Sequence, residues 1–187
     1  LPKKYTKLVI VAGIVVLADQ ISKALILKFL PYHQNIPVIK GFFNITHIRN
    51  PGGAFGLMAN MNPAFRTVVF LFISSLAVGL ILYFYHKTPN SQPYLATGFA
   101  LIFGGAIGNL IDRVRFGNVV DFLDFYLGNL HWPAFNIADS GITIGIFIFI
   151  FHLVFKKLPE KQLRRGLFAK DFGKISINKS QIPNKSQ

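Results

Sequence analysis

The sequence contains no cysteine among its 187 residues. Disulfide scaffolds, thiol nucleophiles and cysteine-based zinc sites are therefore excluded. Acidic residues are also scarce, because Asp and Glu total 7 against 20 Lys and Arg, which gives a formal net charge of +13. Charged residues make up only 14% of the chain, whereas a soluble domain usually carries about 25%. These deficits argue against a disordered chain and against an ordinary soluble enzyme.

Apolar residues are abundant instead. They make up 52% of the chain, and the mean hydropathy is +0.46. A strong excess of basic residues is typical of nucleic-acid binders and also of membrane proteins with basic cytoplasmic segments. Because the polar surface is so small, the second class is favoured. We expect membrane lipid as a partner and no nucleic acid.

Four apolar segments have about the length of a membrane span. A spanning helix needs about 20 largely apolar residues, and the segments cover roughly 8–30, 64–85, 94–111 and 137–155. The first resembles a signal peptide because lysines precede it, but no small-x-small cleavage site follows its apolar core. We therefore interpret it as a retained span. The fold class predicted is an all-α membrane protein with four transmembrane helices.

The distribution of basic residues predicts the orientation. Three lysines precede the first span, Lys87 lies between the second and third, and nine Lys or Arg follow the fourth. The long connections 31–63 and 112–136 are lightly charged for their length. The positive-inside rule then places both termini in the cytoplasm and both connections outside. We expect a transmembrane domain at 1–157 and a basic cytoplasmic tail at 158–187.

Five of the seven acidic residues lie in or beside the spans, where ionisable groups are costly and usually functional. A rise of roughly 1.5 Å per residue places four of them at the outer membrane face, namely Asp112, Asp121, Asp124 and Asp139. Asp121 and Asp124 are expected in the outward loop. The fifth, Asp19, lies in the first span with Lys23 four residues later. An ion pair that lowers the cost of both charges is favoured there over direct catalysis.

Carboxylate chemistry remains after other catalytic chemistries are considered. The five histidines have no ligand spacing, and neither HExxH nor a glycine-rich phosphate loop is present, so we expect no metal and no cofactor. Ser140 adjoins Asp139, but His152 lies about 18 Å further along the helix, too far for a nucleophile–base pair. Two aspartates held close together cannot both ionise easily, so one stays protonated while the other activates water. An aspartic peptidase cleaves amides in this way.

Five sequence blocks resemble those of the signal peptidase II family, the prolipoprotein signal peptidases. The two signature blocks correspond to Val119-Val120-Asp121-Phe122 and Phe135-Asn136-Ile137-Ala138-Asp139-Ser140. Three further blocks precede them in the family's order: Asp19-Gln20-Ile21-Ser22-Lys23, Asn50-Pro51-Gly52-Gly53-Ala54-Phe55-Gly56, and Gly104-Gly105-Ala106-Ile107-Gly108-Asn109-Leu110-Ile111-Asp112-Arg113. Any one block is weak evidence, but five in order over about residues 8–157 are highly specific.

The resemblance implies a multi-pass protein of the bacterial inner membrane, with a small periplasmic β-cradle and a short periplasmic helical segment. The β-type runs 36–39 and 42–48 suit the cradle. The implied activity is that of an aspartic endopeptidase acting on diacylglyceryl-modified prolipoproteins at the periplasmic face. It removes their signal peptide by cutting just before the lipidated cysteine. We expect a monomer.

The resemblance also implies roles for individual residues. Asp121 and Asp139 match the catalytic aspartates. Positions that match substrate-binding or supporting residues are Asp19, Lys23, Asn50, Gly53, Ala54, Asn109, Arg113 and Asn136. For Asn136, which opens the fourth span, simple helix capping is an alternative role.

Two other classes of function remain open from the residues alone. A small carboxylate-dependent transporter or proton relay would need acids at mid-depth along a path, and only Asp19 fits that description. A non-enzymatic membrane scaffold would not require aspartates clustered at one face. Cleavage of a lipidated precursor by the purified protein, without metal or nucleotide, distinguishes a peptidase from both.

Overall fold

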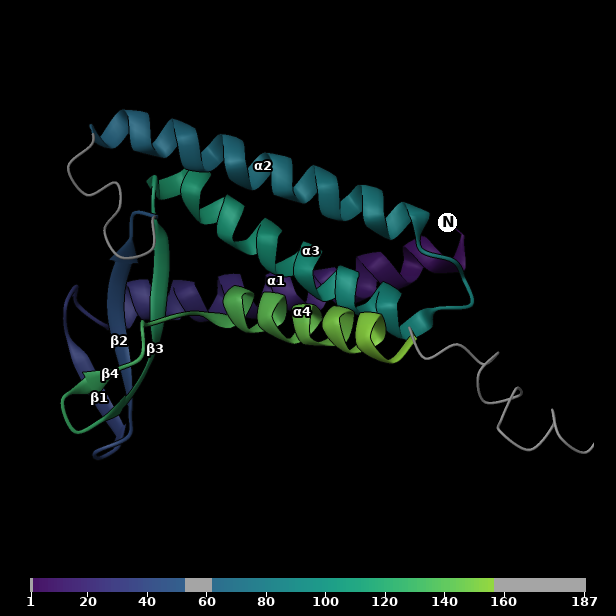
Figure 1. Ribbon diagram of the computed structural model, residues 1–187. Helices are drawn as coiled ribbons and strands as arrows, with labels where there is room; N and C mark the ends of the chain where they lie inside the picture. Colours follow the sequence, from purple (N-terminus) through teal and green to yellow (C-terminus); the bar gives the residue numbers. More distant parts are fainter. Residues whose placement is uncertain (1, 53–61, 157–187) are drawn as a thin grey trace, which may run out of the picture. The chain divides into compact units, whose positions relative to one another are not determined.

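The computed structural model describes residues 2–52 and 62–156, which contain four helices and one antiparallel sheet (Figure 1). Their order is α1 (Lys3–Phe29), β1 (Asn35–Ile39), β2 (Phe43–Asn50), α2 (Pro63–Lys87), α3 (Pro93–Phe116), β3 (Val119–Leu127), β4 (Leu130–His131) and α4 (Ile137–Lys156). All four helices are long and apolar enough to cross a membrane, which confirms the predicted number of apolar helices. The chain divides into two compact units, Leu1–Ile150 and Phe151–Gln187. The fold described below belongs to the first unit.

Capping residues explain where several helices begin and end. Asn62 precedes α2, and its Oδ1 accepts a hydrogen bond from the backbone N of Ala64 at 2.8 Å. Pro63 and Pro93 occupy the first turns of α2 and α3, where a missing N–H costs nothing. The left-handed Gly117, with φ 71°, ends α3. This last turn directs the chain straight into β3.

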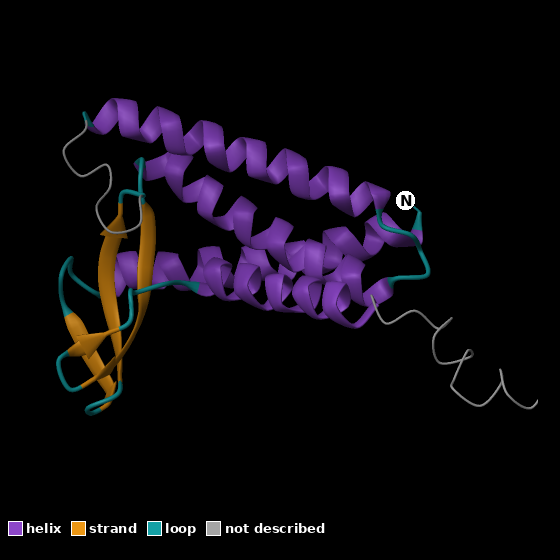
Figure 2. Cartoon of the chain, in the orientation of Figure 1, coloured by secondary structure: helices purple, strands orange, loops and turns teal. Residues whose placement is uncertain are grey.

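The sheet has the strand order β1-β2-β3-β4, and its strands lie together at one end of the helices (Figure 2). β1 and β2 confirm the β-type runs expected at 36–39 and 42–48. The expectation of a loop around Asp121 and Asp124 is wrong, because both lie in β3. This strand pairs with β2 in a register that places Ile48 opposite Asp121. Among the described residues no further helix corresponds to the short segment that the family resemblance implies.

Helices α1, α3 and α4 approach one another through small residues. A Cβ atom at Gly104 would lie 2.8 Å from the Cα atom of Ala12 in α1. One at Gly105 would lie only 2.3 Å from the carbonyl oxygen of Ala138, at the start of α4. Backbones that touch in this way are typical of membrane helices with small-xxx-small faces. The start of α4 is thus held directly against α3.

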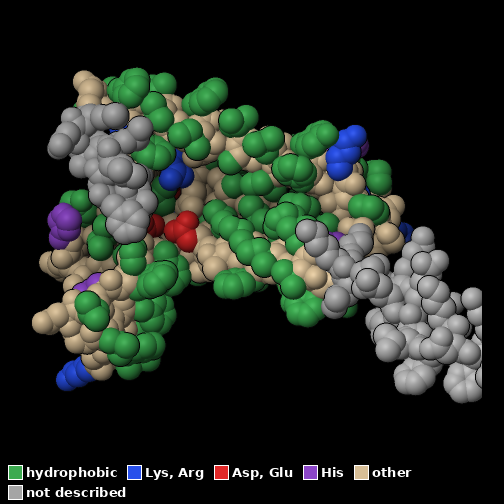
Figure 3. All heavy atoms as spheres, viewed as in Figure 1, with side chains coloured by type: hydrophobic (Ala, Val, Ile, Leu, Met, Phe, Trp, Pro, Cys, Tyr) green, Lys and Arg blue, Asp and Glu red, His purple; other side chains and the backbone are tan. Residues whose placement is uncertain are grey.

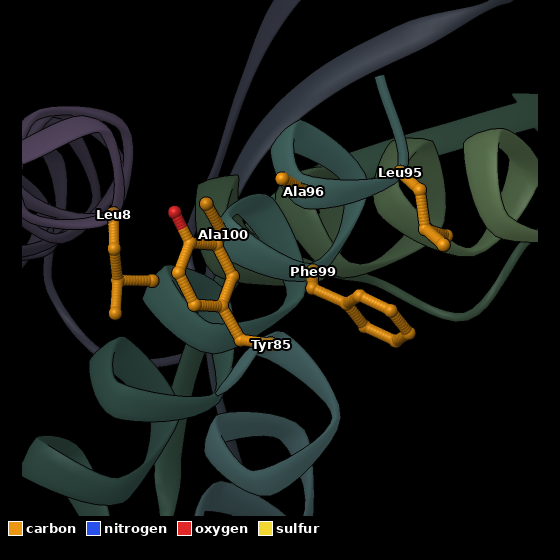
Figure 4. Close-up of a cluster of buried hydrophobic side chains, with 6 residues drawn as sticks. All are labelled: Leu8, Tyr85, Leu95, Ala96, Phe99 and Ala100. Carbon is orange, nitrogen blue, oxygen red and sulfur yellow. The ribbon is translucent and has the colours of Figure 1, made fainter. Parts of the chain in front are cut away.

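A cluster of buried apolar side chains joins α1, α2 and α3 at the end of the helices opposite to the sheet (Figure 4). Its members are Leu8, Tyr85, Leu95, Ala96, Phe99 and Ala100. Elsewhere many large apolar side chains are exposed, including Phe72 and Phe147 at 69% each. An outer surface of this kind suits contact with lipid tails rather than water.

Candidate active site

Asp121 in β3 and Asp139 in the first turn of α4 are both bound by one residue, Asn136. The Asn136 Nδ2 donates to Asp121 Oδ1 at 2.7 Å. Its backbone N donates to Asp139 Oδ2 at 3.3 Å, and its Oδ1 accepts from the backbone N of Asp139 at 2.9 Å. This reciprocal pair of bonds is a capping box with aspartate at the third helical position. Asn136 therefore caps α4, as the alternative role suggests, and also connects the two carboxylates.

Each carboxylate has a second amide partner. Asn109 in α3 donates from Nδ2 to Asp139 Oδ1 at 2.7 Å. Asn50, the last residue of β2, donates from Nδ2 to Asp121 Oδ2 at 3.1 Å. Three asparagines from separate parts of the sequence thus donate hydrogen bonds to the pair.

The two carboxylates differ in environment. Asp121 is only 2% exposed, whereas Asp139 is partly exposed. Burial, followed by the nearby negative charge of Asp139, raises the pKa of Asp121 to about 7. The amide bonds and the charge of Lys23 act in the opposite direction. In the space-filling view, acidic side chains reach the surface near basic ones where the sheet meets the helices (Figure 3). With its raised pKa, the carboxyl group of Asp121 can hold one proton for the pair, which leaves the carboxylate of Asp139 free to accept a second proton.

A buried ion group lies beside the pair. Lys23 Nζ lies 2.8 Å from Asp19 Oδ2 and 2.9 Å from Asp112 Oδ2. The ion pair expected within α1 is present. Asp112, however, does not join Asp121 and Asp139 as the expected clustering suggested, since it is fully buried and bound to Lys23. Its carboxylate faces Lys23 and Gln20 in α1 and the backbone of Val120 in β3 instead of the outer surface.

The ion group also holds the backbone next to each catalytic candidate. Asp19 Oδ1 accepts from the backbone N of Ala138 at 2.9 Å, one residue before Asp139. Asp112 Oδ2 accepts from the backbone N of Val120 at 3.0 Å, one residue before Asp121. Asp19 and Asp112 therefore anchor the two segments that carry the pair.

Gln20 was not anticipated as a site residue. Its Nε2 lies 3.1 Å from Asp19 Oδ2, 3.0 Å from Asp112 Oδ1 and 3.2 Å from the carbonyl oxygen of Gly108. The sequence does contain one indication of this role. Gln20 directly follows Asp19 inside a span, and charged groups in a membrane need polar partners.

Arg113 lies nearby without binding either catalytic candidate directly. Its Nη1 donates to the backbone carbonyl of Asn109 at 3.2 Å, and its guanidinium lies 5.9 Å from the ring centroid of Phe70. Among the described hydrogen bonds and ion pairs, none joins Arg113 to Asp121 or Asp139. Its positive charge is still close enough to interact electrostatically with both.

The turn after β2 is held by Asn50. The Asn50 Oδ1 accepts from the backbone N of Gly52 at 2.9 Å, and Gly52 has φ +88°. A Cβ atom at Gly52 would lie 2.6 Å from the Phe70 ring, so both conformation and space require glycine here. The predicted site residues Gly53 and Ala54 lie outside the described residues.

Asp124 lies apart from the pair. It is three residues beyond Asp121 along β3, and side chains alternate between the two faces of a strand. Its Oδ2 accepts from Asn44 Nδ2 at 3.0 Å, and its Oδ1 lies 2.8 Å from His131 Nδ1. In residues 2–52 and 62–156 no group of three or more metal-ligating side chains could hold a metal ion.

Four helices apolar enough to cross a membrane, with two aspartates bound to one asparagine at one end, fit the class of membrane aspartic peptidases. A family model described as Signal peptidase (SPase) II matches residues 11–155. The chain belongs to the signal peptidase II family, whose aspartic peptidases remove the signal peptides of prolipoproteins. It is accordingly a hydrolase, and no observation supports the transporter or proton relay.

Relatives and solved structures agree with this assignment. The chain is 56% identical over 154 residues to the lipoprotein signal peptidase of Desulforapulum autotrophicum, covering 82% of this chain and 95% of that protein. It is 47% identical to the lipoprotein signal peptidase of Syntrophus aciditrophicus, covering 81% and 94% respectively. A bacterial membrane enzyme solved by the in meso method at 2.3 Å resolution has a TM-score of 0.72 and 34% identity, covering 83% of this chain and 93% of its own.

Proposed function

We propose that Asp121 and Asp139 are the catalytic dyad of this peptidase. The dyad hydrolyses the amide bond just before the diacylglyceryl-modified cysteine of a prolipoprotein. The observation that carries the proposal is the joint attachment of both carboxylates to Asn136, with one buried and the other partly exposed. Such a difference in environment is what separates an acid from a base in paired carboxylates.

In this mechanism Asp121 carries the shared proton, because its pKa is raised to about 7. Asp139 is ionised at the N-terminus of α4, where the helix dipole stabilises negative charge. Asp139 takes a proton from water as the water oxygen attacks the scissile carbonyl carbon. Asp121 donates its proton to the carbonyl oxygen, and the tetrahedral intermediate forms. Its collapse breaks the C–N bond, with a proton delivered from the dyad to the leaving amine.

The remaining predicted residues support this chemistry in different ways. Asn136, Asn109 and Asn50 fix the carboxylate oxygens, whereas Asp19 and Lys23 hold the backbone and Asn109 in place. Arg113 supplies positive charge beside the pair. Gly53 and Ala54 contact the substrate in this proposal, which rests on the family resemblance alone.

We also propose that both termini are cytoplasmic and that the sheet and the dyad face the periplasm. The asymmetry of basic residues supports this orientation. The proposed peptidase is a monomer in the inner membrane, with its catalytic domain at 1–157 and a basic tail at 158–187. Reporter fusions at Asn60 and Asn129 should read as external, and fusions at Asn90 and Lys170 as cytoplasmic. An external signal at Asn90 would refute the orientation.

A cleavage assay tests the dyad and the substrate together. Purified protein in detergent, with EDTA and without nucleotide, should cleave a precursor peptide that carries a diacylglyceryl cysteine. The same peptide with an unmodified cysteine is the matched substrate control and should be cleaved far more slowly. Equal rates on both peptides would remove the lipid from substrate recognition.

A further inference from the structure

A cavity of about 550 Å³ lies between the start of α1 and the turn that joins α2 to α3. These segments lie at the end of the helices opposite to the sheet (Figure 1). Its volume falls within the range of ordinary ligand sites. The charged residues that line it are all basic: Lys3, Lys4 and Lys7. His86 and the Tyr5 and Tyr85 side chains add further polar groups, and no aspartate or glutamate lines the cavity within the described residues.

Hydrogen bonds hold the basic side chains over the turn. Lys4 Nζ donates to the carbonyl oxygens of His86 at 2.7 Å and Thr88 at 2.5 Å. Lys7 Nζ donates to the carbonyl oxygen of Pro93 at 2.7 Å. An ammonium group has three N–H donors, so these bonds leave donor capacity on both lysines. The cavity therefore carries positive charge on ammonium groups that hydrogen bonds hold in fixed positions.

The base of the cavity is rigid. Tyr85 and Ala96 line the cavity and also belong to the buried apolar cluster shown in Figure 4. The Tyr85 hydroxyl donates to the backbone carbonyl of Lys4 at 2.5 Å. Substitution of a lysine head at the rim leaves this packing in place.

The position of the cavity indicates the kind of anion. It lies at the ends of helices long enough to span a membrane. The exposed residues Tyr83 and Tyr94 lie within two residues in sequence of the lining residues Tyr85 and Pro93. Tyrosines are typical of the membrane–water interface, and basic pockets between helices at that depth bind lipid headgroups. The nearest described aspartate along α1 is Asp19, about 18 Å beyond Lys7, so no described carboxylate on α1 competes for the lysines.

We propose that this cavity binds the phosphate of an anionic phospholipid headgroup, with the acyl chains lying along the exposed apolar surface of the adjoining helices. The site is separate from the dyad, and its binding does not depend on the proposed peptidase chemistry. It requires only that this end of the helices lies at a membrane surface.

Native mass spectrometry of the purified full chain in detergent tests the proposal by titration with phosphatidylglycerol and, in parallel, phosphatidylcholine. The test variant combines Lys3→Gln with Lys7→Gln, and the matched control combines Lys28→Gln with Lys40→Gln at the other end of the first unit. Each rim lysine should contribute roughly fivefold to affinity, so the test variant should bind phosphatidylglycerol roughly 25-fold more weakly. The control should bind it as the unmodified chain does.

Several outcomes would overturn the proposal. Equal weakening in the test and control variants would show general charge attraction without a site. Equal binding of phosphatidylcholine would remove the anionic requirement, and full competition by soluble glycerol phosphate at millimolar concentration would reassign the cavity to free phosphates. The single variant Lys3→Gln leaves the Lys4 and Lys7 bonds intact and should alone weaken binding roughly fivefold, so the test remains valid if the double variant fails to accumulate.

Discussion

Lys23 donates from Nζ to Asn109 Oδ1 at 3.1 Å. This bond fixes the orientation of the Asn109 amide, because a lysine can only donate and must face the amide oxygen. The amide nitrogen then points to Asp139 Oδ1, at 2.7 Å. The lysine in α1 thus determines which atom of Asn109 in α3 faces the carboxylate of Asp139 in α4.

Lys23→Gln should therefore damage both stability and catalysis. Removal of the cation leaves the buried carboxylates of Asp19 and Asp112 without their partner, which typically costs about 3–5 kcal/mol. We expect a clearly lower thermal unfolding midpoint in detergent, together with a loss of cleavage that cooling does not restore. Lys28→Gln, at the end of the same helix, is the control and should leave both properties unchanged. An unaltered midpoint for Lys23→Gln would contradict the proposed role of the ion group.

Asp121→Asn and Asp139→Asn should each abolish turnover while substrate binding persists. Asparagine keeps the shape of the side chain but can neither carry the shared proton nor accept one from water. We expect the rate of cleavage to fall by at least roughly a thousandfold for each variant, with the affinity for a lipidated precursor changed little.

Asp124→Asn is the control for the dyad. Asp124 binds Asn44 and His131 on the other face of β3, so its substitution should reduce cleavage far less. An inactive Asp124→Asn enzyme alongside a normally active Asp121→Asn enzyme would show that the dyad is wrongly assigned.

Cleavage should depend on pH as a bell-shaped curve. The pKa of Asp121 is about 7, so this carboxyl group is protonated below pH 7 and loses its proton above it. Because the mechanism needs that proton, the rate should fall as pH rises through about 7. The rate should also fall at acid pH, where the pair takes up a second proton. A rate that still increases between pH 7 and 9 would contradict Asp121 as the proton carrier.

Gly52→Val should impair cleavage by disturbing the turn that positions Asn50. Gly52 has φ +88°, and a Cβ atom there would meet the Phe70 ring at 2.6 Å. A strained backbone of this kind costs about 1–3 kcal/mol, and relief of the strain should shift the turn and move Asn50 away from Asp121. We therefore expect kcat/KM to fall roughly tenfold. Gly41→Val is matched in conformation, with φ +82°, but no atom lies within 4 Å of its Cβ position. Equal effects of the two substitutions would mean that backbone strain alone, without the site, explains the loss.

Gly53→Val, at the neighbouring position, remains a prediction from the Pro-Gly-Gly sequence and should also impair cleavage.

Deletion of residues 164–187 should leave cleavage largely intact, because all five family blocks precede the tail. The measurement compares cleavage rates at equal amounts of membrane-inserted enzyme. A severe loss in a truncated enzyme that accumulates normally would give the tail a role in catalysis or substrate capture.

The helices could be predicted from the sequence because their signal is local. Runs of apolar residues between basic flanks define each span, and Asn62, Asn136 and the helix-initial prolines mark where α2, α3 and α4 begin. The runs of β1 and β2 were recognisable for the same reason. The Asp19–Lys23 pair also follows from local spacing, since residues four apart share one face of a helix.

Pairing between distant residues was the part that local patterns did not reveal. The β3 segment has β-branched residues at Val119 and Val120, but it forms a strand because it pairs with the free edge of β2, which lies much earlier in the sequence. Likewise, Asp112 was grouped with the outer acids because depth along a helix says nothing about rotation toward Lys23. The contacts of Gln20 with Gly108 and Asp112 could not be predicted for the same reason, because they join α1 to a distant helix.

The ion group has a consequence for the way in which α1 assembles with the later helices. During synthesis α1 emerges first, and at that stage Lys23 has Asp19 within the same helix but not Asp112, which follows 89 residues later (112 − 23). The local pair neutralises the charges of Asp19 and Lys23 in the C-terminal half of α1 while this helix stands alone in lipid. The arrival of α3 then adds a second carboxylate, which gives α1 a specific partner among the later helices. Lys23 thus first lowers the cost of placing α1 in the bilayer, through its pair with Asp19, and later binds α1 to α3 through Asp112.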